Sequence, residues 1–439
     1  MLRKTGSLLA LWGMMVLLGG AGCRGPESKP IVLRWATWGD VSGTNILQAA
    51  VDGFKKAHPG VEVQLDRIPF GEYISKLLVQ YSAGMAPDVV AVNCDMLPAF
   101  ASKGILADLK PYVDKDPSVQ LTDYFPEAVE HYTVHGVLTA IPSDISPICV
   151  IYYNKKKFDE AGVPYPKNDW DQDQFLKTAR ELTKKDPKGK ISQFGFVDEW
   201  PIWDAWVYTF NGQMVDNEQK PSRCTLDSPE AIAGVQFRAD LINRYKVMPG
   251  PAYITAMGGL GNSQLFINGT VAMYHSGIWQ SPAFRQIRDF DWDVVEFPKG
   301  PQGHRGFPMD AAGYGVLKGS PHPELAYELV KYLTGETAEK YIGATGLIQP
   351  AILKVAQSKV FLDGQKPLSK GFLPGSVKYG HYRSFDPDVM EWTNLVGSEL
   401  DRVWNGTETA AQALKKAVRE VNGKFFSRSE GAGSNQKVP

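Results

Sequence analysis

The sequence is poor in cysteine and has no excess of charge of either sign. Its 439 residues include four cysteines, and its 47 basic and 48 acidic side chains leave a formal net charge of −1. Four cysteines are too few for a fold held together by a disulfide framework. A nucleic-acid partner normally requires a basic excess or a basic patch, which this charge balance does not offer. The sequence therefore predicts neither a disulfide scaffold nor nucleic-acid binding.

Common catalytic and metal-binding patterns are also missing. We find no nucleophile elbow, P-loop or dinucleotide fingerprint in a suitable context. Aspartates at alternate positions begin a pattern like that of a calcium-binding loop: Asp169, Asp171 and Asp173. Gln174 stands where such a loop needs glycine, so these acids are expected to cap a helix. His131 and His135 have the spacing of a zinc-protease pair, but Tyr132 occupies the position of the required glutamate. The sequence predicts no catalytic residues, no metal site and no cofactor.

The first 22 residues are expected to form an export signal. Arg3 and Lys4 precede an apolar run from Leu8 to Leu18, which is too short to span a bilayer and is followed by small residues suited to a signal peptidase. Residues 20–23 resemble a bacterial lipobox with Cys23 as the lipidated residue, although Gly20 stands where leucine is usual. We expect residues 23–30 to be a lipid-anchored tether. Secretion without a lipid remains the alternative.

The rest of the chain has the pattern of an α/β protein. Its 43% hydrophobic and 22% charged residues suit a globular protein with real cores, and its length favours two or three domains. Expected strands cover residues 31–36, 61–65 and 88–92, and expected helices cover residues 47–54, 74–81, 170–182, 325–333 and 410–421. Ser228 is expected to cap a further helix. Strands that alternate with helices predict parallel pairing with crossover connections. Residues 427–439 are polar and are expected to form a disordered tail.

Six short phrases, in a fixed order, then resemble a known family. They are FKKAHPGV at residues 54–61, AGMAPDVV at 83–90, YYNK at 152–155 leading to AG at 161–162, FINGTVAM at 266–273, FPKGP at 297–301 and GLIQP at 346–350. Together they resemble the extracellular solute-binding proteins of bacterial ABC importers, in the sugar-binding branch that includes the maltose-binding proteins. One such phrase would be weak evidence, whereas six in register are strong.

The resemblance implies a two-lobed periplasmic-binding-protein fold, similar to type II, with three crossover segments and a ligand cleft between the lobes. The N-terminal lobe would comprise residues 31–141 plus 310–349, and the C-terminal lobe residues 142–309 plus 350–426. The crossovers would fall near residues 140–146, 306–312 and 346–352. Hinge closure around a ligand is the motion expected of such a protein. The physics of α/β folds also places ligands between domains, at the carboxyl ends of strands.

A sugar presents hydroxyl edges, which need paired hydrogen bonds, and C–H faces, which stack on aromatic rings. The resemblance and the positions of polar and aromatic residues after strands together predict a set of ligand-binding residues. They are Trp38, Asp40, Asn93, Asp95, Asp144, Glu199, Trp200, Trp203, Trp279, Asp310 and Tyr382. Trp279 stands where relatives commonly stack a sugar ring, and Tyr382 where they contribute another aromatic contact.

Each of these residues also has a purely structural interpretation. Trp38 could pack within its lobe while Asp40 caps the next helix, and Asn93 could form an Asx turn. The tryptophans at residues 200–206 are three positions apart and could form a packing stripe on one helical face. Asp144 and Asp310 could make hydrogen bonds within the crossovers.

The sequence thus predicts an exported, non-enzymatic, monomeric protein. It would capture a carbohydrate, such as a neutral oligosaccharide or a related polyol, and deliver it to the permease subunits of an ABC importer by hinge closure. It would be held at the outer face of the cytoplasmic membrane or in the periplasm. A binding protein for a non-sugar solute, such as a glycerol phosphate ester or a peptide, is the first alternative. Anionic ligands favour basic sites, however, and these loops are acidic and aromatic. A secreted carbohydrate-active enzyme is the second alternative.

Overall fold

The computed structural model describes residues 30–427 except residues 40, 259–260 and 363. The expected export signal, Cys23, Asp40 and almost all of the expected tail therefore lie outside the described residues. Within the described part of the chain, no helix combines the length and the apolar character needed to cross a membrane.

A six-stranded mixed sheet forms the centre of the first lobe. Its strands are β1 (Ile31–Thr37), β2 (Val61–Arg67), β3 (Val89–Asn93), β6 (Ile141–Pro147), β12 (Phe307–Val316) and β13 (Gly380–His381). The order is β13-β12-β3-β1-β2, and β6 also pairs with β12. β1 lies parallel to both β2 and β3, as the strand–helix alternation predicted. β12 runs antiparallel to β3 and to β6.

Helices and a small hairpin surround this sheet. The helices are α1 (Val41–Ala57), α2 (Phe70–Ser82), α3 (Leu97–Ser102), α4 (Lys110–Val113), α5 (Pro126–Tyr132), α13 (Pro323–Leu333), α14 (Glu336–Ala344) and α15 (Leu353–Ala356). The hairpin consists of β4 (Thr133–Val134) and β5 (Val137–Leu138). Gly84 follows α2 with a φ of +67°, a conformation that glycine adopts without steric cost and that ends the helix.

A five-stranded sheet forms the centre of the second lobe. Its strands are β7 (Val150–Asn154), β8 (Lys184–Lys185), β9 (Ile191–Asp198), β10 (Val271–Ser276) and β11 (Trp292–Glu296), in the order β11-β7-β10-β9-β8. The helices around it are α6 (Lys155–Ala161), α7 (Gln172–Glu181), α8 (Trp203–Thr209), α9 (Pro229–Asn243), α10 (Pro251–Ala256), α11 (Asn262–Ile267), α12 (Ser281–Phe284), α16 (Lys359–Leu362), α17 (Leu373–Ser376), α18 (Val389–Trp404) and α19 (Ala410–Val421).

Side-chain caps explain why several of these helices begin where they do. Asp171 accepts hydrogen bonds from the backbone N–H groups of Asp173 and Gln174 and forms a capping box at the start of α7. Ser228 accepts from the N–H of Ala231 at the start of α9. The expected roles of Asp171 and Ser228 as helix caps are therefore confirmed.

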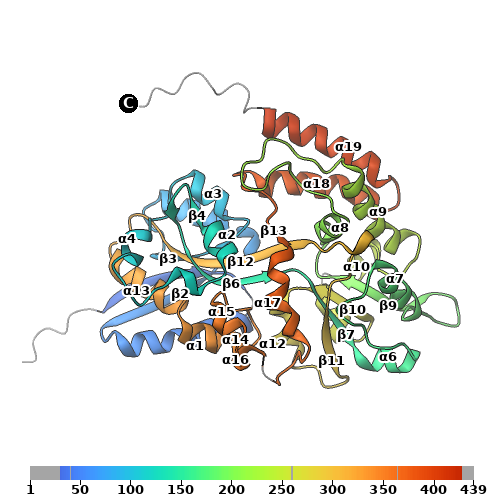
Figure 1. Ribbon diagram of the computed structural model, residues 1–439, viewed down its shortest axis with the longest axis horizontal. Coiled ribbons are helices and arrows are strands. Elements are labelled where there is room, and N and C mark those ends of the chain that lie inside the picture. The colour runs from blue at the N-terminus through green and yellow to red at the C-terminus, as the bar shows by residue number, and fades with distance from the viewer. Residues whose placement is uncertain (1–29, 40, 259–260, 363, 428–439) are drawn as a thin grey trace, which may run out of the picture.

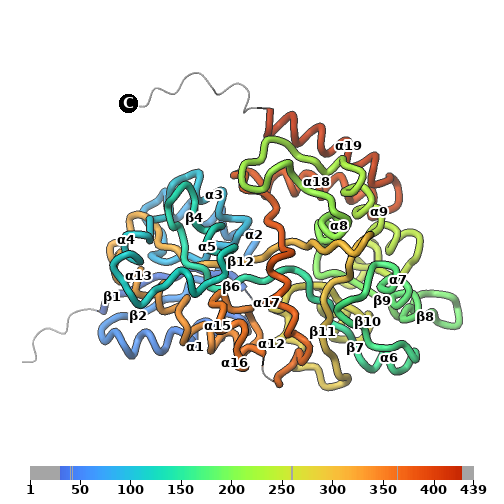
Figure 2. Tube along the Cα trace, viewed as in Figure 1, coloured from blue at the N-terminus to red at the C-terminus, as the bar shows by residue number. Residues whose placement is uncertain are grey.

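The strands β6 and β12 carry the chain between the lobes. Figure 1 shows the two sheets on opposite sides of the molecule, with β6 and β12 between them. The buried apolar residues of the first sheet form two clusters, and those of the second sheet form a third. In the trace of Figure 2 the orange segment that contains α13 returns to the first sheet, whereas the red helices α18 and α19 cover the second lobe.

The third passage between the lobes comes late in the chain. Ala351, Ile352 and Ala356 pack in the apolar clusters of the first sheet. Phe361 packs in the apolar cluster of the second sheet. This packing favours a crossing after Ala356 rather than at residue 350. The exact lobe boundaries stay a prediction.

Candidate functional site

Four strands end beside polar and aromatic residues singled out in the sequence. β1 ends just before Trp38, and β3 ends at Asn93. β9 ends at Asp198 just before Glu199, and β10 ends at Ser276 just before the turn that contains Trp279. β9 and β10 are parallel neighbours, so their carboxyl ends meet at one edge of the second sheet. This arrangement brings Glu199 and Trp279 together.

Glu199, Trp200, Trp279 and Gln280 form a compact group that we name the aromatic platform. The Glu199 carboxylate accepts hydrogen bonds from Nε1 of Trp279 at 3.1 Å and from Nε2 of Gln280 at 2.6 Å, and also from the Ser276 hydroxyl. The indole rings of Trp200 and Trp279 lie nearly parallel, with an interplanar angle of 9° and centroids 6.2 Å apart. Trp200 is 38% exposed, so one lobe presents an accessible indole beside a carboxylate.

Local sequence fixes the position of the Trp279 ring. A Cβ on Gly277 would lie 1.8 Å from Cζ3 of this indole, so only glycine leaves room for the ring against the backbone. Burial raises the pKa of Glu199, and the hydrogen bonds from its neighbours oppose that rise. The sequence prediction did not include Gln280 or Ser276, although both flank residues that it did include.

In the first lobe, Asn93 links the loop after β3 to the crossover strand β12. Its side-chain Nδ2 donates to Oδ1 of Asp310 at 2.6 Å, and its Oδ1 accepts from the backbone N–H of Asp95 at 2.9 Å. The second bond is an Asx turn, so the structural role considered for Asn93 is present. Cys94 is 2% exposed, and burial raises the pKa of its thiol well above the usual range. Cys94 therefore behaves as a small buried residue, as its surroundings in the sequence suggested.

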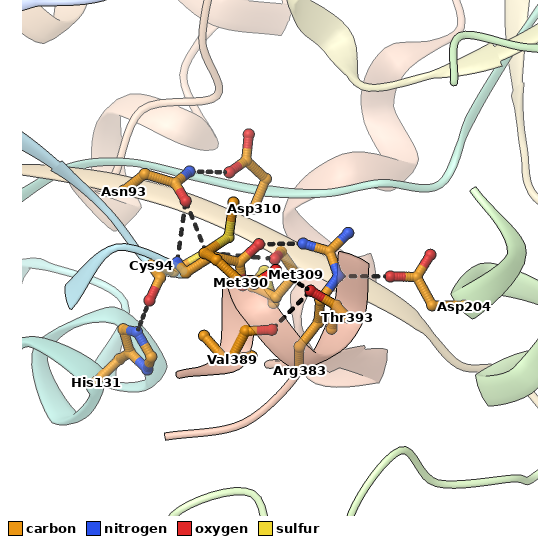
Figure 3. A network of polar contacts seen from close by, with 11 residues as sticks. Asn93, Cys94, His131, Asp204, Met309, Asp310, Arg383, Val389, Met390 and Thr393 are labelled. Carbon is orange, nitrogen blue, oxygen red and sulfur yellow. Dashed lines mark hydrogen bonds and ion pairs between the residues drawn. The ribbon is translucent and has the colours of Figure 1, made fainter. Parts of the chain in front are cut away.

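Arg383 lies between two carboxylates that come from different lobes (Figure 3). Its Nε pairs with Oδ2 of Asp204 on α8 at 2.6 Å, and its Nη1 pairs with Oδ2 of Asp95. Burial raises the pKa of Asp95, and the Arg383 guanidinium opposes that rise. Tyr382, but not Arg383, was predicted from the sequence to bind ligand. No spacing rule connects Arg383 to partners so far away in the chain.

Tyr382 packs directly beside this bridge. Its ring stacks on the imidazole of His131, with centroids 3.8 Å apart and an interplanar angle of 15°. Its backbone N–H donates to the Glu218 carboxylate at 3.2 Å. His131 is 3% exposed, and burial lowers its pKa to about 4, so the imidazole in this stack is neutral at physiological pH.

Asp144 and Asp310 lie on the paired crossover strands β6 and β12. Asp144 Oδ1 accepts from the backbone N–H of Ala312 at 3.1 Å, which is the crossover hydrogen bond considered for this residue. Burial, followed by the charge of Asp310, raises the pKa of Asp144 to about 8. Burial, followed by the charge of Asp95, raises the pKa of Asp310 to about 6. Asp310 thus interacts electrostatically with both Asp144 and Asp95.

Two predicted tryptophans occupy packing positions. Trp38 is half-buried, and its ring meets Tyr73 and Phe70 edge-on, with centroids 5.1 and 5.6 Å away. Trp203 lies on α8, is 8% exposed and belongs to the core of the second lobe. Among the ring contacts of the described residues, Trp200 and Trp279 contact each other, and neither contacts Trp38 or Trp203.

The described residues contain no group of three or more histidine, cysteine or acidic side chains arranged to hold a metal ion. Two surface hollows lie elsewhere, one beside Tyr112 and Tyr327 in the first lobe and one beside Ile242 and Trp404 in the second. Neither hollow is lined by a residue predicted to bind ligand. The candidate residues thus form two groups, the aromatic platform in the second lobe and the loop after β3 with its partners in the first lobe.

Comparison with known proteins gives consistent matches over most of the chain. The family described as bacterial extracellular solute-binding protein matches residues 40–340. The galactooligosaccharide-binding protein of Bacillus subtilis (strain 168) is 24% identical over 407 residues, which cover 90% of both chains.

Solved structures agree with these matches. An ABC substrate-binding protein from Listeria monocytogenes, in complex with cycloalternan, has a TM-score of 0.81 and 26% identity, and covers 90% of this chain and 98% of its own. Maltose-bound MalE3 from T. maritima has a TM-score of 0.77 and 21% identity, and covers 90% of this chain and 99% of its own. These similarities confirm the two-lobed α/β fold that the sequence predicted.

Proposed function

The chain belongs to the family of bacterial extracellular solute-binding proteins, and from this membership we propose that it captures a neutral oligosaccharide or a related polyol. The captured sugar would then pass to the permease subunits of an ABC importer when the two lobes close. The protein performs no reaction in this proposal and needs no cofactor.

The observation that carries the proposal is the aromatic platform. Two parallel indoles, one of them 38% exposed, lie beside a carboxylate that already orders a tryptophan N–H and a glutamine amide. Indole faces suit the C–H faces of a sugar ring, and the carboxylate and amide suit its hydroxyl groups. A site built from such groups discriminates against ligands that leave its polar atoms unpaired.

The first lobe would contribute polar contacts from the opposite side of the cleft. Asn93, Asp95 and Asp310 form one connected set, with Asp144 and Tyr382 close by. The names of two similar proteins point to the same ligand class, because one binds galactooligosaccharides and another was solved with cycloalternan.

Trp38 and Asp40 would contribute at the end of β1. The burial of Trp203 favours packing against the ligand-facing residues rather than direct stacking.

Ligand binding would stabilise the closed arrangement by its greater affinity for that arrangement than for the open one. The permease would recognise the closed protein. We further propose that the protein is exported, that it is anchored through Cys23 and that it acts as a monomer. The apolar leader and the lipobox support the first two of these proposals.

A thermal-shift screen of the purified protein tests the proposal. The panel would contain mono-, di- and oligosaccharides, polyols, glycerol phosphates and peptides. A ligand that binds only the native state adds about 2.7 kcal/mol at 100 times its dissociation constant, which corresponds to a shift of a few degrees. Stabilisation by neutral sugars alone is the expected result. Stabilisation only by phosphates or peptides would contradict the proposed ligand class.

The enzyme alternative needs a separate measurement with the sugars that bind. Each is incubated with the protein, and the products are separated by chromatography. Intact sugar is the expected result. Hydrolysis that disappears in Glu199→Gln or Asp95→Asn would instead identify a carbohydrate-active enzyme.

A further inference from the structure

Residues 380–385, which we name the strap, comprise β13 and the segment that leads from it toward α18, and they contact both lobes. β13 belongs to the first sheet, whereas α17 before it and α18 after it lie in the second lobe. Among the strap residues only Tyr382 was predicted to bind ligand. The strap contains His381, Tyr382, Arg383 and Phe385, all of which make contacts with residues distant in the sequence.

Glu218 and Asp204 hold the strap on the second lobe. Glu218 pairs with Nδ1 of His381 at 2.8 Å, and its backbone carbonyl accepts from the N–H of Phe385 at 2.6 Å. Asp204 pairs with Nε of Arg383 at 2.6 Å. The imidazole of His381 also stacks on Tyr208 of α8, with centroids 4.6 Å apart. These contacts come from α8 and from the loop that follows it.

The same strap reaches the first lobe through Arg383 and Tyr382. Arg383 Nη1 pairs with Asp95, two residues beyond the end of β3. The Tyr382 ring stacks on His131 of α5, and its hydroxyl lies 3.5 Å from the carbonyl oxygen of Glu127 on the same helix. Figure 3 shows Arg383 between Asp204 on one side and the loop that carries Asn93 and Cys94 on the other.

We propose that the strap is a non-covalent connection between the lobes and that Arg383 is its positioning residue, stabilising the closed arrangement by pairing Asp95 with Asp204. This inference rests on the lobe closure of the proposed function. It adds a specific residue that biases the closure before any ligand is present.

The three charged groups of the bridge lie mostly out of contact with water. The Arg383 side chain is 18% exposed, that of Asp95 11% and that of Asp204 4%, so all three are largely withdrawn from water. A guanidinium can serve two carboxylates at once because its five N–H donors have a fixed planar geometry. The strap is held on the first-lobe side as well, because β13 pairs with β12 and Tyr382 stacks on His131. Separation of the lobes would therefore break either the pair of Arg383 with Asp95 or its pair with Asp204. The closed arrangement alone therefore contains the complete bridge.

Removing the guanidinium would leave two partly desolvated carboxylates close to each other and to Asp310. Burial raises the pKa of Asp95 and the charge of Asp204 adds to the rise, while burial and then the charge of Asp95 raise the pKa of Asp310. Such repulsion is relieved most readily when the lobes move apart and water enters. Loss of Arg383 should thus open the ligand-free protein.

Distances between spin labels in the ligand-free protein test this inference. Val79 on α2 is 69% exposed and Lys415 on α19 is exposed, so cysteines introduced there report on the separation of the lobes. Cys94, Cys149 and Cys224 are buried, which disfavours their labelling. Arg383→Met should shift the distance distribution to longer values and broaden it. Arg383→Lys should shift the distribution less, because the lysine ammonium keeps the positive charge but lacks the planar set of donors of the guanidinium.

Arg305→Met is the matched control. Arg305 also pairs with a buried carboxylate, Glu296, but its partners all belong to the second lobe. It should lower stability and leave the distance distribution unchanged. A folded Arg383→Met protein with the wild-type distribution would overturn the inference. If that variant does not fold, Asp95→Asn removes the first-lobe charge while keeping the size of the side chain, and it must lengthen the distances for the inference to stand.

The experiment separates this inference from the proposed function because it uses no ligand. Longer distances in Arg383→Met with no sugar binding in the thermal-shift screen would support the strap and contradict the proposed ligand. Unchanged distances together with sugar binding would contradict the strap and support the proposed ligand.

Discussion

At the scale of single residues, the orientation of Trp279 depends on its neighbours as much as on its own ring. The Glu199 carboxylate accepts from the indole Nε1, and Gly277 leaves the space in which the indole lies. The sequence singled out Trp279 through the family resemblance, and it singled out Glu199 because that residue adjoins the tryptophans at residues 200–206. It could not predict that the two residues bind each other, since they are 80 positions apart.

Trp279→Ala should therefore weaken sugar binding strongly. Truncation of an aromatic side chain at the centre of a binding site typically weakens the binding free energy by about 2 kcal/mol, which raises the dissociation constant roughly 30-fold. Calorimetric titration with a sugar from the thermal-shift screen measures the change. Tyr165→Ala is the control, because Tyr165 is 42% exposed in the same lobe and makes no contact with the aromatic platform. Equal affinities for wild type and Trp279→Ala would contradict the role assigned to the platform.

Asp144 should make the stability of the folded protein depend on pH. Its pKa is raised from 3.8 to about 8 in the folded state, first by burial and then by Asp310. Between these values the folded state keeps a proton that the unfolded state has lost. Stability should therefore fall as the pH rises from about 4 to about 8, by at most about 1.4 kcal/mol per pH unit for this one group.

Asp144→Asn should flatten this dependence, as urea unfolding at pH 5 and pH 8 would show. The amide oxygen can still accept from Ala312, so the fold should tolerate the change. Asp116→Asn is a useful control, because the Ser118 and Lys331 side chains lower the pKa of Asp116 to about 2, outside this pH window. Identical slopes for wild type and Asp144→Asn would show that the Asp144 carboxyl does not retain its proton in the folded state.

At the scale of elements, the contact between α8 and α9 positions Asp204 for its pair with Arg383. Gly234 of α9 lies against the backbone of α8, where a Cβ would be 2.3 Å from the carbonyl oxygen of Trp206. The helices can approach this closely only with glycine at position 234. Three other features of local sequence predicted helices: Asp171 at the start of α7, Ser228 at the start of α9 and the apolar spacing within α19. Such predictions succeed because caps and apolar spacing act within a few residues.

Gly234→Ala should consequently destabilise the protein by about 1–3 kcal/mol or more, because the two helices must separate to admit the methyl group. Gly397→Ala is the matched control in a helix, α18, where a Cβ would meet nothing within 4 Å. That substitution should raise stability by about 0.5–1 kcal/mol, since alanine favours helix more than glycine does. Thermal unfolding of both variants provides the comparison. Similar effects of the two substitutions would contradict the packing of α8 on α9.

At the scale of the whole molecule, the order of elements was accessible from the sequence but the contacts between the lobes were not. The alternation of strands and helices predicted β1, β2 and β3 and their parallel pairing. The bridge from Asp95 to Arg383 joins residues 288 positions apart. Neither periodicity nor a cap encodes such a contact, because it arises only when the chain has returned between the lobes several times.

Sugar binding should narrow the distribution of distances between the lobes. A ligand that contacts both lobes shifts the population toward the closed arrangement. The shift should be larger in Arg383→Met than in wild type, because the variant begins with fewer closed molecules, and its apparent affinity should fall by the same factor as its closed population. The labelled protein used for the strap measures both effects. An unchanged distribution in saturating sugar would contradict closure as the mode of binding.

A crystal structure of the protein with the neutral sugar that stabilises it most tests the central claim most directly. The account predicts a sugar ring in contact, at about 4 Å, with the indole faces of Trp200 or Trp279, and hydroxyl groups bonded to carboxylates of both lobes, Glu199 among them. A sugar bound away from the aromatic platform, or held by one lobe alone, would contradict the account.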